Sequence, residues 1–171
     1  MSLGLRRTDV RLSEYDSEWE QIFQAECARL AEVLGERAAA IEHIGSTSVP
    51  GLKAKPILDI AVGLWTMEDA ASLVRPLEEL GYVYRPKSGT PERLFFAKGP
   101  EECRTHYLHC EVYGSASWRG QLLFRDRLIQ NPQLRQAYQA LKEQLAAQYP
   151  DDRQRYTQGK ESFIQQVLSA P

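Results

Sequence analysis

The sequence predicts an α+β fold: a mixed β-sheet flanked by helices, with a helical segment at its C-terminal end. Strand-like and helix-like stretches alternate over the first two thirds of the chain, and from Ser117 onward the apolar residues recur only at helical spacing. A chain of 171 residues is long enough for one domain with a proper core. We therefore expect a flexible N-terminus over residues 1–9 and a single domain over residues 10–171, with residues 116–171 forming its helical part.

The first predicted element is an amphipathic helix. Apolar residues recur at helical spacing from Trp19 to Leu34, Asp16 or Ser17 precedes them as a cap, and Gly35 follows them.

Two strands are predicted next, over residues 39–44 and 57–64, with a tight turn at Gly45 and Ser46 after the first. A helix over residues 70–80 should follow. Thr66 would cap this helix, Gly81 would end it and Pro76 would kink it.

The rest of the chain contains three further strands and then three helices. The strands are expected at 82–85, 93–98 and 104–113, separated by turns rich in Gly and Pro. The helices are expected at 118–130, from the Asn131 cap with Pro132 at the first helical position to about Leu145, and from the Asp151–Asp152 cap to about Leu168.

Composition limits the classes of function. The formal net charge is −2 with both signs well represented, so the chain has no global field that would hold nucleic acid or an anionic membrane. Any anion site must be local. There is no apolar run that could span a bilayer and no signal-peptide pattern, and the three cysteines form no CxxC pair. We expect a cytoplasmic protein with a small-molecule ligand; its oligomeric state is left open.

The turn after the first strand is a candidate anion site. Gly45 permits the turn, and Ser46, Thr47 and Ser48 offer amides and hydroxyls at the start of a short helical turn, with Lys55 close behind in sequence. The alternative is a structural turn with a Ser/Thr cap.

Asp59 is the second candidate. Side chains alternate along a strand, so Asp59 shares a face with Ala61 and Gly63, whose small side chains leave room above it. A carboxylate on a buried face is costly unless it is paired, hydrogen-bonded or bound to a metal.

The string "HIGSTSVPGLKAKPILDI" resembles the signature of the GrpB family, which has no established activity and a nucleotidyltransferase-like fold. The resemblance extends to "YDSEWEQIFQAECARL", "RTHYLHCEVYGSASW", "LLFRDRLIQNPQLRQAYQALKEQLA" and "GKESFIQQVL", and so covers almost the whole chain. It implies a turn that holds a triphosphate and strand carboxylates that hold Mg²⁺ or Mn²⁺ for nucleotidyl transfer. The pattern of active nucleotidyltransferases has two acids separated by one residue on the strand, and the second position here is Ala61, which cannot bind a metal ion.

Glu111 is the best substitute for the missing acid. On an extended strand His109 and Glu111 share a face, so Glu111 could complete a metal site with Asp59. His109 could bind phosphate, act as an acid or base, or ligate a transition metal. The alternative is that His109 and Glu111 pair with each other or with an arginine on a solvated face.

Arg125 and Lys160, on the predicted C-terminal helices, could reach over the cleft to phosphate. The alternative for each is a surface charge on an amphipathic helix.

Three functions compete. The first is a nucleotidyltransferase-like protein that binds a nucleotide or phosphate compound, with Asp59, Glu111 and His109 in the catalytic centre. The second is a catalytically inactive ligand- or partner-binding domain, which Ala61 favours. The third is metal-assisted hydrolysis by His109 and Glu111.

Overall fold

The computed structural model describes residues 3–68 and 70–170, and its centre is one mixed sheet with the strand order β1-β2-β5-β4-β3. β2 and β5 are parallel, and the other neighbours are antiparallel. The strands are β1 (Ala38–Ile44), β2 (Leu58–Leu64), β3 (Tyr82–Tyr84), β4 (Arg93–Lys98) and β5 (His106–Val112). The α+β class with a mixed sheet is thereby confirmed.

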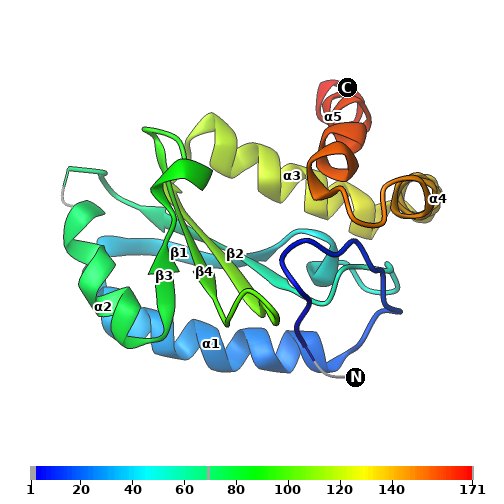
Figure 1. Ribbon diagram of the computed structural model, residues 1–171. Coiled ribbons are helices and arrows are strands. Elements are labelled where there is room, and N and C mark those ends of the chain that lie inside the picture. The colour runs from blue at the N-terminus through cyan, green and yellow to red at the C-terminus, as the bar shows by residue number, and fades with distance from the viewer. Residues whose placement is uncertain (1–2, 69, 171) are drawn as a thin grey trace.

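The helices cover both faces of this sheet. They are α1 (Glu18–Leu34), α2 (Val74–Glu79), α3 (Ala116–Gln130), α4 (Pro132–Gln148) and α5 (Arg153–Ser169). Figure 1 shows α1 and α2 beneath the sheet, and α3 above it with α4 and α5 alongside. The predicted caps of α4 and α5 are present: Asn131 and Asp152 each accept a hydrogen bond from a backbone amide of the first turn. Ser115 caps α3 in the same way.

Strand alternation separates the main core from the face that carries the candidate site. On β2, Leu58, Ile60 and Val62 pack into a large cluster that includes Trp19 and Phe23 of α1. Asp59 and the residues two positions away on either side of it point to the opposite face, toward the C-terminal helices. In the part of the chain that the structure describes, none of the helices combines the length and apolar character needed to cross a membrane.

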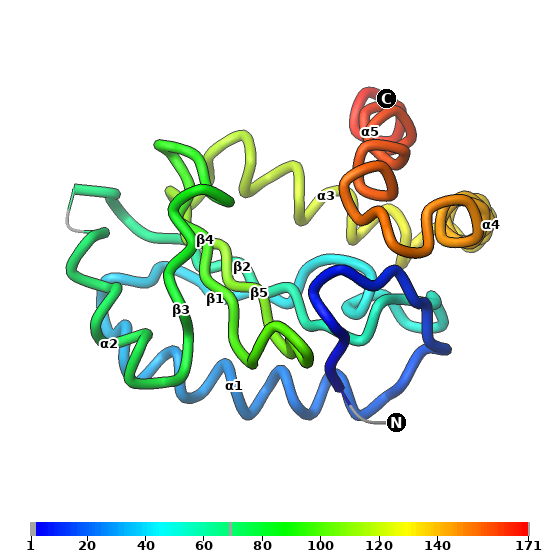
Figure 2. The backbone as a smooth tube through the Cα atoms, in the orientation of Figure 1, coloured from blue at the N-terminus to red at the C-terminus, as the bar shows by residue number. Residues whose placement is uncertain are grey.

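The structure corrects two expectations. Residues 3–9 are not a free tail: Leu5 is buried and forms a β-bridge with Arg104, and the segment lies against the body of the protein (Figure 2). Residues 1–2 lie outside the described part. Pro76 does not kink a helix over 70–80, because a 3-10 turn at Ala70–Leu73 comes first and α2 begins at Val74. The proline therefore lies in the first helical turn, where its missing N–H needs no partner.

Candidate functional site

A cavity of about 590 Å³ lies between the Asp59 face of the sheet and helices α3, α4 and α5. Its size is that of a small-molecule site. Cationic side chains dominate its charged lining, and Asp59 is the one acid among the described residues that line it. The cations are Lys55, Arg93, Lys142, Arg153 and Lys160.

Asp59 lies directly beside the glycine of the preceding turn. The antiparallel pairing of β1 with β2 places Asp59 opposite Ile44, next to Gly45. Gly45 has φ of 71°, and a Cβ at this position would lie 2.8 Å from Asp59 Oδ2. Only glycine satisfies both the backbone conformation and this close approach. The turn and the acid therefore form one rigid wall of the cavity.

The charge of Asp59 is stabilised by its neighbours. Its side chain is 35% exposed, and Oδ1 lies 3.3 Å from His109 Nε2. Burial alone would raise the pKa of Asp59. The hydrogen bond with His109 and the positive charges of His109, Lys55 and Arg153 outweigh burial and hold the pKa below its ordinary value. Asp59 is therefore an ionised acid in a basic cavity.

Lys142 reaches the turn from α4. Its Nζ donates to Ser46 Oγ at 2.9 Å and to the carbonyl of Lys53, and it lies 5.0 Å from the centre of the Tyr138 ring. Only 1% of the residue is exposed. Burial, followed by the charges of Lys160 and Lys55, lowers the pKa of Lys142 well below its ordinary value. An anion bound beside Ser46 would favour its charged form.

Lys55 and Lys160 both approach the ring of Tyr156. Their Nζ atoms lie 5.3 Å and 4.5 Å from the ring centre, within the range of cation–π interactions. Burial, with Arg153 and Lys160 adding to it, lowers the pKa of Lys55 to about 7. Burial lowers the pKa of Lys160 to about 8, with Asp59 opposing. Both amines therefore titrate close to neutral pH.

Arg153, at the start of α5, is held on β5. Its Nη1 donates to the hydroxyl of Tyr107 at 2.6 Å and to the carbonyl of Arg7 at 3.2 Å, and the guanidinium carbon lies 4.8 Å from the Tyr107 ring centre. The N-terminal segment thus helps to orient a cation of the cavity.

Six of the predicted site residues line the cavity: Gly45, Ser46, Thr47, Lys55, Asp59 and Lys160. Ser48 instead closes the turn, donating its hydroxyl hydrogen bond to the carbonyl of Gly45 at 2.5 Å.

The structure does not bring Asp59 and Glu111 together. In the parallel pairing of β2 with β5, Asp59 lies opposite Tyr107 and Glu111 lies opposite Gly63. Four residues along the strands separate the two acids by about 13 Å, so they do not share a metal ion. Among the described residues, no cluster of three or more His, Cys, Asp or Glu side chains could hold a metal.

His109 reaches the cavity only through Asp59. It is absent from the described lining residues, and its ring packs on Phe95 with 5.2 Å between ring centres. The paired site of His109 and Glu111 that a hydrolase would need is likewise not formed on the cavity wall. In this arrangement His109 can orient Asp59 and support its charge.

Ala61 is not in an open, wet position. It is 0% exposed and packs with Ile44 and Trp118 in a small apolar cluster. The expectation that the small side chain of Ala61 leaves open room on the Asp59 face is therefore wrong at this position, because Trp118 of α3 covers it.

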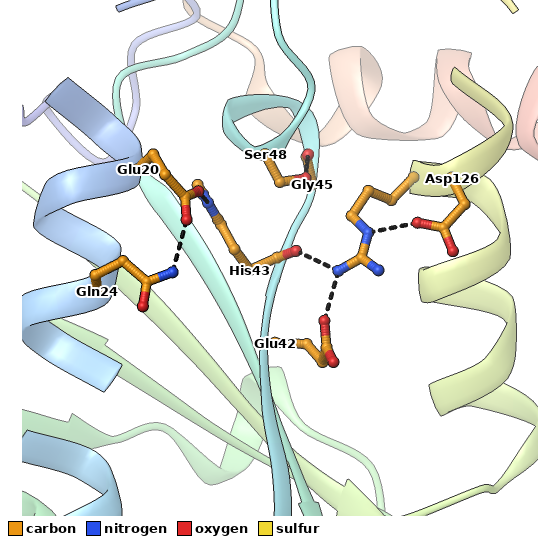
Figure 3. Close-up of polar contacts among 8 residues, drawn as sticks. Glu20, Gln24, Glu42, His43, Gly45, Ser48 and Asp126 are labelled. Atoms are coloured by element: carbon orange, nitrogen blue, oxygen red, sulfur yellow. Dashed lines mark hydrogen bonds and ion pairs between the residues drawn. The ribbon is translucent and has the colours of Figure 1, made fainter. Parts of the chain in front are cut away.

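Arg125 does not reach the cavity lining. Its guanidinium donates to Glu42 at 2.7 Å, to the carbonyl of His43 at 2.9 Å and to Asp126 at 2.8 Å. Figure 3 shows Asp126 on α3 facing Glu42 and His43 of β1, with Glu20 and Gln24 on the other side of the strand. The phosphate role expected for Arg125 is replaced by a structural one, joining α3 to β1.

Sequence reasoning missed Lys142, Arg153 and Arg93. A signal existed only for Lys142, which follows Tyr138 by four residues and so places a cation on the apolar stripe of its helix. Nothing in the sequence distinguishes Arg153 from the other arginines of its helix, because its role depends on where α5 lies.

Comparisons with known proteins place this chain among GrpB-like sequences. The family model described as "GrpB protein" matches residues 9–170. The glutamate-rich protein GrpB of Alkalihalophilus pseudofirmus is 33% identical and is aligned over 98% of each chain. The UPF0157 protein YqkA of Bacillus subtilis is 37% identical over 91% of this chain, which spans only 45% of that relative.

Solved structures agree on the fold. The conserved protein GrpB of Enterococcus faecalis superposes with a TM-score of 0.84 at 36% identity, over 92% of this chain and 94% of the other. The Cid1 poly(U) polymerase with MgGTP bound gives a TM-score of 0.51 at 12% identity, over 78% of this chain and 44% of that one. The likeness to Cid1 concerns the nucleotidyltransferase-like fold alone.

Proposed function

This chain belongs to the GrpB family, and we propose that it binds a nucleotide or another phosphate compound in the basic cavity. One observation carries the proposal: lysines and arginines from a loop, a strand and two helices converge on one nucleotide-sized cavity in a chain whose net charge is −2. Cations held this close together repel one another, and a bound polyanion relieves that repulsion.

The cations of the cavity differ in the contacts that they can make with phosphate. Arg153 can contact two phosphate oxygens at once, because its planar guanidinium presents parallel N–H donors. Lys55, Lys142 and Lys160 act as point charges, and Lys142 already contacts the hydroxyl of Ser46. The phosphate groups would therefore lie between the Gly45–Ser46 turn and α5.

Asp59 would hold one Mg²⁺ or Mn²⁺ together with phosphate oxygens of the ligand, and the cation would neutralise phosphate charge. His109 would keep Asp59 ionised and oriented. Transfer of a nucleotidyl group to an acceptor is the reaction class that this arrangement supports, and the acceptor is not specified by the site.

A second candidate is a binding domain without catalysis. The packing of Ala61 against Trp118 favours it, because the position of a second strand acid is filled by an apolar contact. Both candidates require the phosphate site, and only the first requires turnover.

Calorimetric titration with pyrophosphate and with ADP tests the phosphate site. Lys160→Met should weaken binding of both about tenfold or more, since a charged hydrogen bond is worth about 1.5–3 kcal/mol. Lys53→Met is the matched control: its ammonium pairs with Glu14 and Glu143 outside the cavity, and ADP affinity should not change.

The titrations can either reject the proposed function or lead to a choice between its two candidates. If neither pyrophosphate nor ADP binds the parent protein, the proposed function is wrong. If both bind, release of pyrophosphate from nucleoside triphosphates with Mg²⁺ or Mn²⁺ identifies the enzyme, and binding without release identifies the binding domain.

A further inference from the structure

The cavity has a second end with a different chemistry. Beyond the basic end, the lining passes to Ser117 and Gln121 of α3 and to Arg93 of β4. Arg93 pairs with Glu111 across β4 and β5, four residues along the sheet from the level of Asp59. This far end is therefore about 13 Å from the basic end.

Gln121 has one fixed amide orientation at this far end. Its Nε2 donates to Glu111 Oε1, and also lies 3.3 Å from the carbonyl oxygen and 3.2 Å from the hydroxyl of Ser117. A carboxylate and a backbone carbonyl only accept hydrogen bonds, so the nitrogen of the amide must face them. The remaining atom, Gln121 Oε1, is an acceptor on a side chain that lines the cavity.

Glu111 is well suited to this positioning. It is 1% exposed, and its Oε2 has no hydrogen-bond partner among the described residues. A buried carboxylate with a spare oxygen favours any available N–H donor, because leaving it unpaired is costly. A flipped Gln121 would place two acceptors against each other, so Glu111 excludes that orientation.

We propose that Gln121, oriented by Glu111, reads the uncharged part of the ligand by accepting a hydrogen bond from a nucleobase N–H. This inference rests on the proposed function, since the phosphates at the basic end place the base at the far end. Glu111 is then a positioning residue that acts through Gln121. The cavity therefore takes a nucleotide in preference to a simple phosphate compound.

A fixed acceptor can be detected by comparing two nucleobases that carry opposite hydrogen-bonding groups at the same position. Adenine carries an amino donor where hypoxanthine carries a carbonyl acceptor, and the same exchange separates cytosine from uracil. A rigid acceptor discriminates within such a pair, whereas an amide free to flip does not. The test is therefore a calorimetric titration with ADP, IDP, CDP and UDP, with pyrophosphate as the base-free probe.

The parent protein should bind one member of at least one pair about tenfold or more tightly than the other, because the weaker ligand leaves a polar group of the site unpaired. In Glu111→Gln the new amide can donate or accept, so only the carbonyl of Ser117 still favours the present orientation of Gln121, and the ratio should fall. Pyrophosphate affinity should stay unchanged. Gln121→Met, which keeps the length of the side chain and removes the acceptor, should erase the same ratio.

Equal binding within both pairs by the parent protein overturns the inference, and so does a ratio that survives in Gln121→Met. If Glu111→Gln fails to fold, the Gln121→Met result decides alone. Pyrophosphate distinguishes failure of this inference from failure of the proposed function. If pyrophosphate binds but the nucleotides show no base preference, the role of Gln121 is rejected and the phosphate site is kept. If no probe binds, the proposed function itself is rejected.

Discussion

Ligand binding should take up protons at slightly alkaline pH. Burial lowers the pKa of Lys55 to about 7 and that of Lys160 to about 8 in the free protein. A phosphate anion favours the charged amines and raises both pKa values, so the complex holds more protons than the free protein. The affinity for phosphate is then greatest below pH 7 and falls as the pH rises through 7 and 8.

The magnitude follows from the two pKa values. At pH 8, Lys55 is about one-tenth protonated and Lys160 about half protonated, so full protonation of these two amines in the complex takes up about 1.4 protons, to which Lys142 adds if the anion lies beside Ser46. The dissociation constant for ADP then rises roughly 25-fold per pH unit near pH 8. ADP itself keeps a constant charge there, because its terminal phosphate has a pKa of about 6.

Calorimetry in buffers of different ionisation enthalpy measures this uptake directly. Lys55→Met should reduce the uptake at pH 8 by about 0.9 protons and Lys160→Met by about 0.5 or more, because the charge of Lys160 also lowers the pKa of Lys55, whereas Lys53→Met should leave the uptake unchanged. Binding of ADP with no proton uptake between pH 7.5 and 9 would refute the reasoning, since it would mean that neither amine faces the phosphates.

Three substitutions test other parts of the site. Ala61→Asp should lower the free energy of unfolding by roughly 3 kcal/mol or more in urea titration, because it forces a carboxylate against Trp118. Gly45→Ala should cost more than Gly51→Ala by about 1–3 kcal/mol in the same assay; both have positive φ, but only Gly45 abuts Asp59. Asp59→Asn should tighten metal-free pyrophosphate binding in calorimetry and remove its response to Mg²⁺, because an anion leaves the cavity. Equal costs for the two glycines, a stable Ala61→Asp protein, or an unchanged Mg²⁺ response would contradict these expectations.

Much of the fold follows from local patterns. Hydrophobic periodicity locates the helices and strands to within a few residues, since burial of one face selects the period. The N-terminal segment was not predicted to be packed, because among its described residues only Leu5 is fully buried, and the β-bridge partner of Leu5, Arg104, lies far along the chain.

The candidate site was predictable where its residues are close in sequence. Gly45 and Ser46 directly follow β1 and Asp59 lies on β2, which pairs with β1, so their proximity follows from the alternation of strand and turn. The faces of Asp59 and Glu111 also followed from the period of two. Their separation did not, because the register between parallel strands depends on a long crossover that the sequence pattern does not specify.

The C-terminal helices explain both what the site contains and what it lacks. They bring Lys142, Arg153 and Lys160 over the sheet, where these cations face Asp59. The same helical layer places Trp118 on Ala61, the position where a second strand acid would stand. A second carboxylate there would have to displace an aromatic side chain from the core. Under the proposed function, therefore, positive side chains would replace much of the charge neutralisation that a metal ion held by two strand acids would provide.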